Sequence, residues 1–248
     1  GAVQNAVWAT GKKGAALEFT GSNSYVRVPA APVFNLTTGL TLSAWIHPKA
    51  YPDGKPDQNA GLVGKNYGSE SAYGLRLGAS RNLHFRVYGP FGKEGSIGWF
   101  DYGHANNTEI RLHEWQHAAV TYDGERVRFF INGRLDSVYP ETRSPLVNDR
   151  DVFIGALSEH GRWFTGLIDE VKIYRGALDP DAVRAEYEAD GGGSEGVSGP
   201  VPAAAVKRAG APPSIDGVLD EAVWQAAAPL VLVRAADGKP ADVATAAR

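Results

Sequence analysis

The segment His113-Glu114-Trp115-Gln116-His117 places two histidines four residues apart with a glutamate between them, which is the pattern of many zinc proteases. That pattern binds zinc on a helix, where the two rings lie on one face about one turn apart. On a strand, four residues span roughly 13 Å and the two rings cannot share an ion. Because residues 118–122 are typical of a strand, we interpret this match as accidental.

Asp169 lies in a run in which Leu167, Val171 and Ile173 alternate with other residues, and this predicts its carboxylate on the apolar side of a strand. A buried carboxylate needs a cation, an arginine or backbone donors, since uncompensated burial is costly. Two explanations stay open. One is a calcium ion bound by Asp169 and by oxygen atoms of the turn containing Gly21 and Asn23. The other is a set of hydrogen bonds without metal.

Short alternating runs separated by Gly, Asn, Asp and Pro occupy most of the chain between about Ala16 and Tyr174, as expected for strands of a sandwich. In the run 40–46, one face carries the core candidates Leu40, Leu42, Ala44 and Ile46. The dipeptides Asn132-Gly133 and Asp123-Gly124 predict hairpin turns on either side of the strand 127–131. The sequence therefore predicts an all-β fold.

A short helix and a linker follow the strands. Asp179 is suited to cap a helix that has Pro180 in its first turn and ends at Gly191. We predict a sandwich over residues 1–190, a Gly/Ser/Pro linker over 191–202 and the truncated start of a second domain over 203–248.

Composition excludes several classes of partner. The 25 basic and 28 acidic residues are mixed along the chain, so we expect no binding to nucleic acid. No run of about 18 apolar residues is present, so we expect no membrane insertion. The absence of cysteine excludes disulfides and thiolate chemistry. The absence of methionine and of a signal-peptide pattern leads us to expect a piece of a larger protein with covalently linked neighbouring domains.

The chain from Ala15 to Tyr187 resembles the laminin-G-like, concanavalin A-like jelly-roll family. Four stretches carry the resemblance, namely 16–29, Leu42-Ser43-Ala44-Trp45-Ile46, 115–124 and Gly166-Leu167-Ile168-Asp169-Glu170-Val171-Lys172-Ile173-Tyr174. It implies two stacked antiparallel sheets with a short C-terminal helix, secretion or a cell-surface location, a structural calcium and a glycan or polysaccharide ligand. The tail segment 213–224 resembles the start of a family 9-type carbohydrate-binding domain.

Candidate ligand-binding residues are aromatic or arginine side chains in loops or at strand ends. Aromatic rings stack on the apolar faces of sugars, and arginines bind hydroxyls or acidic substituents. On this basis we select Tyr73, Arg76, Arg86, Trp99, Tyr102, Arg162 and Trp163.

The sequence contains no run of alternating carboxylates of the kind that enzymes of the resembled superfamily use to cleave glycosides. Asp169 and Glu170 are adjacent, so we expect them to point to opposite faces of a strand. We therefore expect a non-catalytic carbohydrate-binding module. The alternatives are an adhesion or protein-recognition module and a glycosidase whose carboxylates come from separate strands.

Overall fold

The computed structural model describes residues 1–53, 58–65, 72–87, 90–91, 96–97 and 108–193. Within these residues the strands form two large antiparallel sheets and one strand pair, β9 (Pro90–Phe91) with β10 (Ser96–Ile97). Sheet A has the order β1 (Ala2–Gln4), β4 (Tyr25–Val28), β14 (Val152–Ile154), β6 (Asn59–Lys65), β7 (Tyr73–Gly78) and β8 (Leu83–Val87). Sheet B has the order β13 (Arg134–Pro140), β12 (Arg126–Ile131), β11 (Gln116–Tyr122), β5 (Leu40–Pro48), β15 (Thr165–Arg175), β3 (Ala15–Thr20) and β2 (Val7–Thr10).

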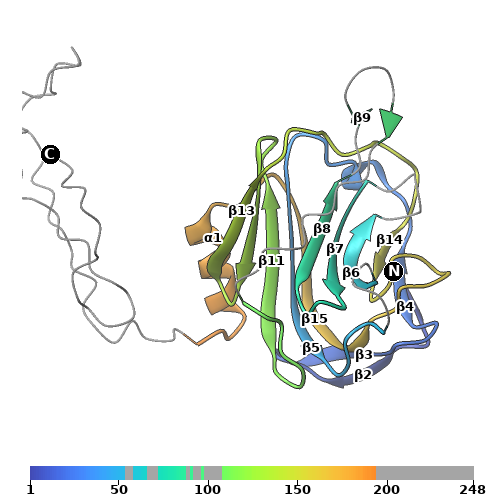
Figure 1. The fold of residues 1–248 in the computed structure, drawn as a ribbon. Helices are drawn as coiled ribbons and strands as arrows, with labels where there is room; N and C mark the ends of the chain where they lie inside the picture. Colours follow the sequence, from blue (N-terminus) through green and yellow to red (C-terminus); the bar gives the residue numbers. More distant parts are fainter. Residues whose placement is uncertain (54–57, 66–71, 88–89, 92–95, 98–107, 194–248) are drawn as a thin grey trace, which may run out of the picture. The chain divides into compact units, whose positions relative to one another are not determined.

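The two sheets stack with one apolar core between them (Figure 1). Strand β5 shows why: the residues predicted to share one face are all buried in this core, namely Leu40, Leu42, Ala44 and Ile46. Strands β7 and β8 supply the opposite side with Tyr73, Leu75, Leu77, Leu83, Phe85 and Val87. The predicted jelly-roll sandwich is confirmed.

Both predicted hairpin turns are present. Asn132 and Gly133 have φ angles of 50° and 71°, as a type I′ turn requires, and they join β12 to β13. Between β11 and β12, Asp123 accepts hydrogen bonds from the backbone N–H groups of Glu125 and Arg126.

Helix α1 (Pro180–Ala189) begins as predicted, because a carboxylate oxygen of Asp179 accepts a hydrogen bond from the N–H of Ala182 at 2.7 Å. The helix lies on the outer face of sheet B (Figure 1), where Val183 packs against Ala119 and Phe130. The helix therefore covers part of the sheet that would otherwise expose apolar side chains.

Strand β15 departs from the predicted alternation. Its register against β5 shifts between Asp169 and Lys172, and Glu170 has a φ of +46°, so the strand contains a bulge. Asp169 is paired with Trp45, on the face away from the core, and the prediction that it lies on the core side is wrong. The extra residue of the bulge reverses the alternation of all residues before it.

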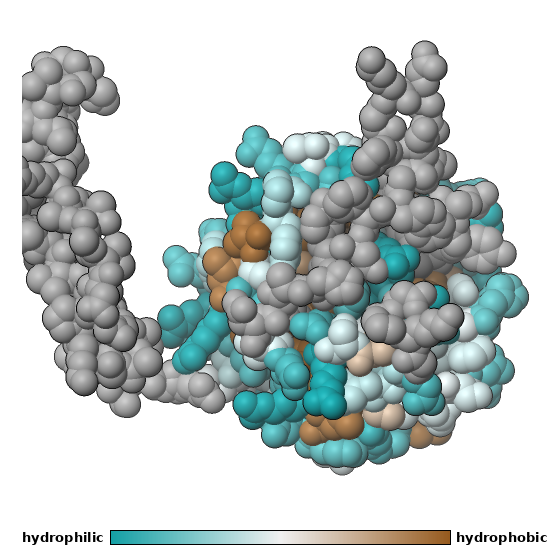
Figure 2. Space-filling model, in the orientation of Figure 1, coloured by the Kyte–Doolittle hydropathy of each residue, from teal (hydrophilic) through white to brown (hydrophobic). Residues whose placement is uncertain are grey.

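Among the coloured residues in Figure 2, hydrophilic and intermediate ones predominate, with scattered apolar residues between them. Among the described residues, no helix has the length and apolar character needed to cross a membrane. The tail from 203 to 248 and most of the linker lie outside the described residues, so the predicted domain division stays a prediction.

Candidate functional site

The outer face of sheet A carries a row of polar side chains. On β7 and β8, Arg76 and His84 are paired across the strands, and Arg86 is opposite Gly74. These residues point away from the core because their neighbours along each strand point into it. Arg76 and His84 are buried, and Arg86 is half-buried.

The segment 155–164 lies against this row. The N–H of Gly155 donates to the carbonyl of Leu62 at 3.0 Å, and the N–H of Gly61 donates to the carbonyl of Arg162 at 2.9 Å. Gly61 is the strand partner of Arg76, so the backbone of Arg162 lies one strand away from Arg76 although the two arginines are 86 positions apart in the chain. We call Asn59, Arg76, His84, Arg86 and Arg162 the arginine row.

The close approach of the segment depends on a glycine. A Cβ atom at Gly61 would lie 2.2 Å from the carbonyl oxygen of Ala156, well inside van der Waals contact. Any larger residue would therefore push the segment off the sheet. At Gly78, a Cβ would lie 2.3 Å from Nε2 of His84, so this glycine leaves room for the imidazole ring.

Specific hydrogen bonds hold the arginine row. Nη1 of Arg76 donates to Oδ1 of Asn59 at 3.3 Å, and Nε2 of His84 is 3.3 Å from the hydroxyl oxygen of Ser80. Arg162 is exposed, with a φ of +62°, and the adjacent Trp163 is half-buried. A planar guanidinium with several donors is suited to bind hydroxyl or carboxylate oxygens, and an indole ring to stack on a sugar.

The other predicted ligand residues have different positions. Tyr73 is fully buried, its hydroxyl donates to the carbonyl of Phe34 at 2.9 Å, and burial raises its pKa. Tyr73 is therefore a core residue that does not present its ring at the surface. Trp99 and Tyr102 lie outside the described residues. Sequence reasoning misses Asn59 and His84, although the alternation through Leu83 and Phe85 would have assigned His84 to the outer face.

The residues predicted to bind calcium are not brought together. Gly21 is beside Phe164 and Thr165, since its N–H donates to the carbonyl of Phe164 at 3.1 Å. Asp169 lies four residues further along β15, roughly 13 Å away. Calcium ligands lie about 2.3–2.6 Å from the ion, so Asp169, Gly21 and Asn23 do not fit a common site.

The carboxylate of Asp169 is instead held by backbone hydrogen bonds. One carboxylate oxygen accepts a hydrogen bond from the N–H of Lys13 at 3.0 Å, and the other accepts from the N–H of Glu170 at 2.8 Å. Within the described part of the chain, no group of three His, Cys, Asp or Glu side chains could hold a metal ion.

Comparison with known proteins settles the family. The laminin G-like family model described as the concanavalin A-like lectin/glucanases superfamily matches residues 20–184, more than half of the chain. The chain belongs to this superfamily. No curated protein matches it.

Solved structures share the concanavalin A-like fold. The binding domain of Paraclostridial Mosquitocidal Protein 1 is 18% identical, with a TM-score of 0.60, over 76% of this chain and 47% of that chain. Domain 4 of AbnA, a GH43 extracellular arabinanase from Geobacillus stearothermophilus solved with arabinotriose, is 22% identical, with a TM-score of 0.52, over 75% of this chain and 81% of that chain. The botulinum neurotoxin serotype G binding domain is 11% identical, with a TM-score of 0.55, over 75% and 45%. The chain spans about half the length of the two toxin domains.

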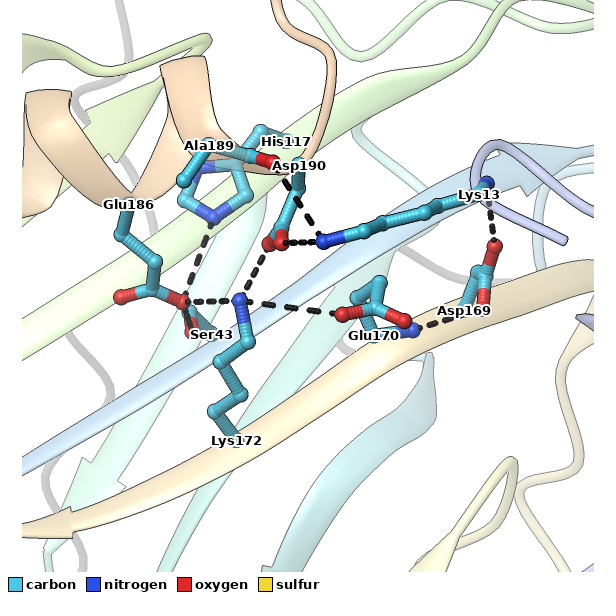
Figure 3. Close-up of polar contacts among 9 residues, drawn as sticks. All are labelled: Lys13, Ser43, His117, Asp169, Glu170, Lys172, Glu186, Ala189 and Asp190. Carbon is cyan, nitrogen blue, oxygen red and sulfur yellow. Dashed lines mark hydrogen bonds and ion pairs between the residues drawn. The ribbon is translucent and has the colours of Figure 1, made fainter.

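The outer face of sheet B, opposite the arginine row, carries a cluster of lysines and carboxylates. Figure 3 shows Lys172 of β15 among Glu170, Glu186 and Asp190, with Lys13 on the other side of Asp190. Nζ of Lys172 is 3.4 Å from Oε1 of Glu186 and also bonds Asp190, and Nζ of Lys13 is 3.2 Å from Asp190. We call these five residues the lysine cluster.

In the lysine cluster, two lysines form ion pairs with three carboxylates. Burial favours the neutral form of Glu186, but its contacts with His117, Ser43 and Lys172 outweigh this and lower its pKa. Burial also works to lower the pKa of Lys172, and its bonds to Asp190 and Glu186 reverse the direction and raise it. Asp169 and Glu170 lie on the same side of the sheet at the bulge, so the expectation that they point to opposite faces is wrong.

The His113–His117 segment does not form a helix. His113 is in a turn with a φ of +61°, and its ring contacts the ring of His47. His117 is buried in β11, with Nε2 3.8 Å from Oε1 of Glu186. The interpretation of the protease-like pattern as accidental is confirmed for the geometry of these residues.

Proposed function

We propose that this protein is a non-catalytic carbohydrate-binding module of a larger secreted, multidomain protein, and that Arg162, Arg86 and Trp163, supported by the buried members of the arginine row, bind a polysaccharide or glycan. One observation carries the proposal. The backbone hydrogen bond from Gly61 to Arg162 brings the loop that carries Arg162 against β6, next to the strand of Arg76, which supports a site shared by residues from distant parts of the chain.

The chemistry of the row is that of sugar recognition. Arg76 is buried and is held by Asn59, so it supports the exposed members of the row in a fixed position, which lowers the entropic cost of binding. Trp163 supplies a half-buried indole beside the exposed Arg162. The AbnA domain, which shares the fold and was solved with arabinotriose, supports a glycan as the ligand class.

The absence of catalysis is part of the proposal. Hydrolysis of a glycoside needs two carboxyl groups that are free to exchange protons or attack the sugar. In the described part of the chain, Asp169 is bonded to two backbone N–H groups, and Glu186 and Asp190 are bonded to lysines. These carboxylates are used for structure.

A glycan array tests the proposal. The wild-type chain should bind a defined set of glycans, and Arg162→Ala should weaken that binding about tenfold or more, the loss typical of a charge-assisted hydrogen bond. Arg134→Ala is the matched control, because Arg134 is also exposed but lies on β13 of the other sheet. Absence of glycan binding together with binding to a protein receptor would instead support a protein-recognition module. Release of sugar from any bound glycan would contradict the non-catalytic assignment.

A further inference from the structure

The N-terminal strands form one edge of the sandwich that is open to solvent. Strand β1 is the last strand of sheet A, and β2 is the last strand of sheet B in the part of the chain that the structure describes. Trp8 on β2 is 71% exposed, which is the largest value among the described large apolar side chains. Val3 on β1 and Val7 on β2 are also about half exposed.

Trp8 and Val3 lie on the faces of their strands that are directed toward the core. Trp8 is paired with Leu17, which packs against the core, and Leu17 is paired with the core residue Ile168. Val3 is paired with Val26, another core residue. Because these two side chains continue the inner faces and are still exposed, the apolar interior reaches the surface at this edge.

The edge is electrically neutral. The first eleven residues contain no charged side chain. Across the strands, Glu18 is opposite Val7 and forms an ion pair with Lys49, and Arg27 is opposite Ala2 and forms an ion pair with Asp151. Proteins usually protect exposed edge strands with lysines or prolines. Strands β1 and β2 contain neither residue and present an exposed tryptophan, so this edge has the character of a ligand-binding surface.

From this edge we infer a second ligand site, which takes a neutral glycan chain. The indole of Trp8 stacks on a sugar ring. Exposed side-chain amides are close to Trp8 in the sequence at Gln4 and Asn5, and Asn5 is hydrogen-bonded to Asn23, whose amide is also exposed. The side chain of Asn5 donates to the carbonyl of Asn23 at 3.0 Å and fixes the turn between β1 and β2. Amides without charges match the hydroxyl groups of a neutral sugar. This inference rests on the proposed function and adds a site and a ligand class to it.

The size of the apolar surface favours a glycan over a protein. A stable protein interface needs about 800 Å² on each partner, with several large anchors. The edge offers one aromatic ring and two valines. One indole is sufficient to cover one sugar ring, and further affinity comes from cooperation with other sites on the same chain.

Affinity electrophoresis in gels that contain arabinan, xylan or mixed-linkage β-glucan, with polygalacturonate as the acidic comparison, tests the inference. In the neutral polysaccharide that retards the wild type, Trp8→Ala should weaken the retardation about fivefold or more. Trp8→Phe should keep most of the retardation. Val147→Ala removes an apolar side chain of similar exposure elsewhere and is the control. The melting temperature of Trp8→Ala should equal that of the wild type, because the ring is exposed.

The outcomes separate the two proposals. Equal retardation of wild type and Trp8→Ala, with loss in Arg162→Ala, would overturn the second site and leave the proposed function intact. A wild type retarded only by polygalacturonate would overturn the neutral ligand class. A wild type that is retarded by none of the four polysaccharides and binds nothing on the glycan array would overturn both proposals. Dimerisation of the wild type that Trp8→Ala abolishes, without loss of retardation, would assign the edge to self-association and overturn the glycan site.

Discussion

The backbone N–H of Lys13 donates a hydrogen bond to the carboxylate of Asp169 at 3.0 Å, and this joins the loop between β2 and β3 to the bulge of β15. Because Asp169 is almost fully buried, loss of its carboxylate leaves backbone donors unpaired. Asp169→Ala should therefore lower the free energy of unfolding by about 1–3 kcal/mol. Urea denaturation of the two proteins measures the difference.

The same variant tests whether calcium binds at Asp169. The stability difference between wild type and Asp169→Ala should be identical in excess calcium and in excess chelator. A rise in the melting temperature of the wild type with calcium, absent in the variant, would restore Asp169 as a metal ligand.

The lysine cluster predicts how stability depends on pH. The pKa values of Glu186 and Asp190 are lowered from 4.5 and 3.8, so the stabilisation they provide is complete above those values and is lost as pH falls through their lower folded pKa values. The pKa of Lys172 is raised from 10.5, so its contribution is complete below 10.5 and is lost as pH rises through the higher folded value.

Lys172→Met should therefore reduce stability most in the range between about pH 5 and pH 10, and less at either extreme. Thermal unfolding of wild type and variant over a series of buffers gives the difference at each pH. A difference that does not change between neutral and strongly acidic solution would show that Lys172 stabilises the domain only through packing.

The stability of helix α1 depends on the hydrogen bond between Asp179 and Ala182. Asp179→Ala removes the acceptor for the N–H of Ala182 and should lower the free energy of unfolding by about 1 kcal/mol. Asp179→Asn or Asp179→Ser should keep most of that energy, since both can accept the same bond. Equal losses in all three variants would mean that the cap does not determine helix stability.

Gly61 tests whether the segment 155–164 forms part of the site. In Gly61→Ala the new methyl group collides with the backbone at Ala156, and the expected cost is about 1–3 kcal/mol together with weaker glycan binding. Calorimetric titration with a glycan identified on the array measures the binding. Unchanged affinity in a destabilised variant would separate the segment from ligand recognition.

The structural features that the sequence predicts correctly are those set by residues close together in the chain. The alternation through β5, the turn at Asn132-Gly133 and the cap at Asp179 are local patterns, and each is present. The bulge at Glu170 was missed because one extra residue leaves no mark in the pattern of apolar side chains. The approach of Arg162 to Arg76 depends on pairing between distant segments, and the exposure of Trp8 depends on which strand ends each sheet. Neither property can be read from local alternation.

The most direct test of the glycan-binding face is an NMR titration of the labelled chain with a glycan that it binds. The account predicts that the backbone amide signals of Gly61, Arg76 and Arg162 shift together and saturate at one ligand concentration, while those of α1 stay unchanged. Saturable binding that leaves these three signals in place and shifts residues of α1 or the outer face of sheet B would contradict it.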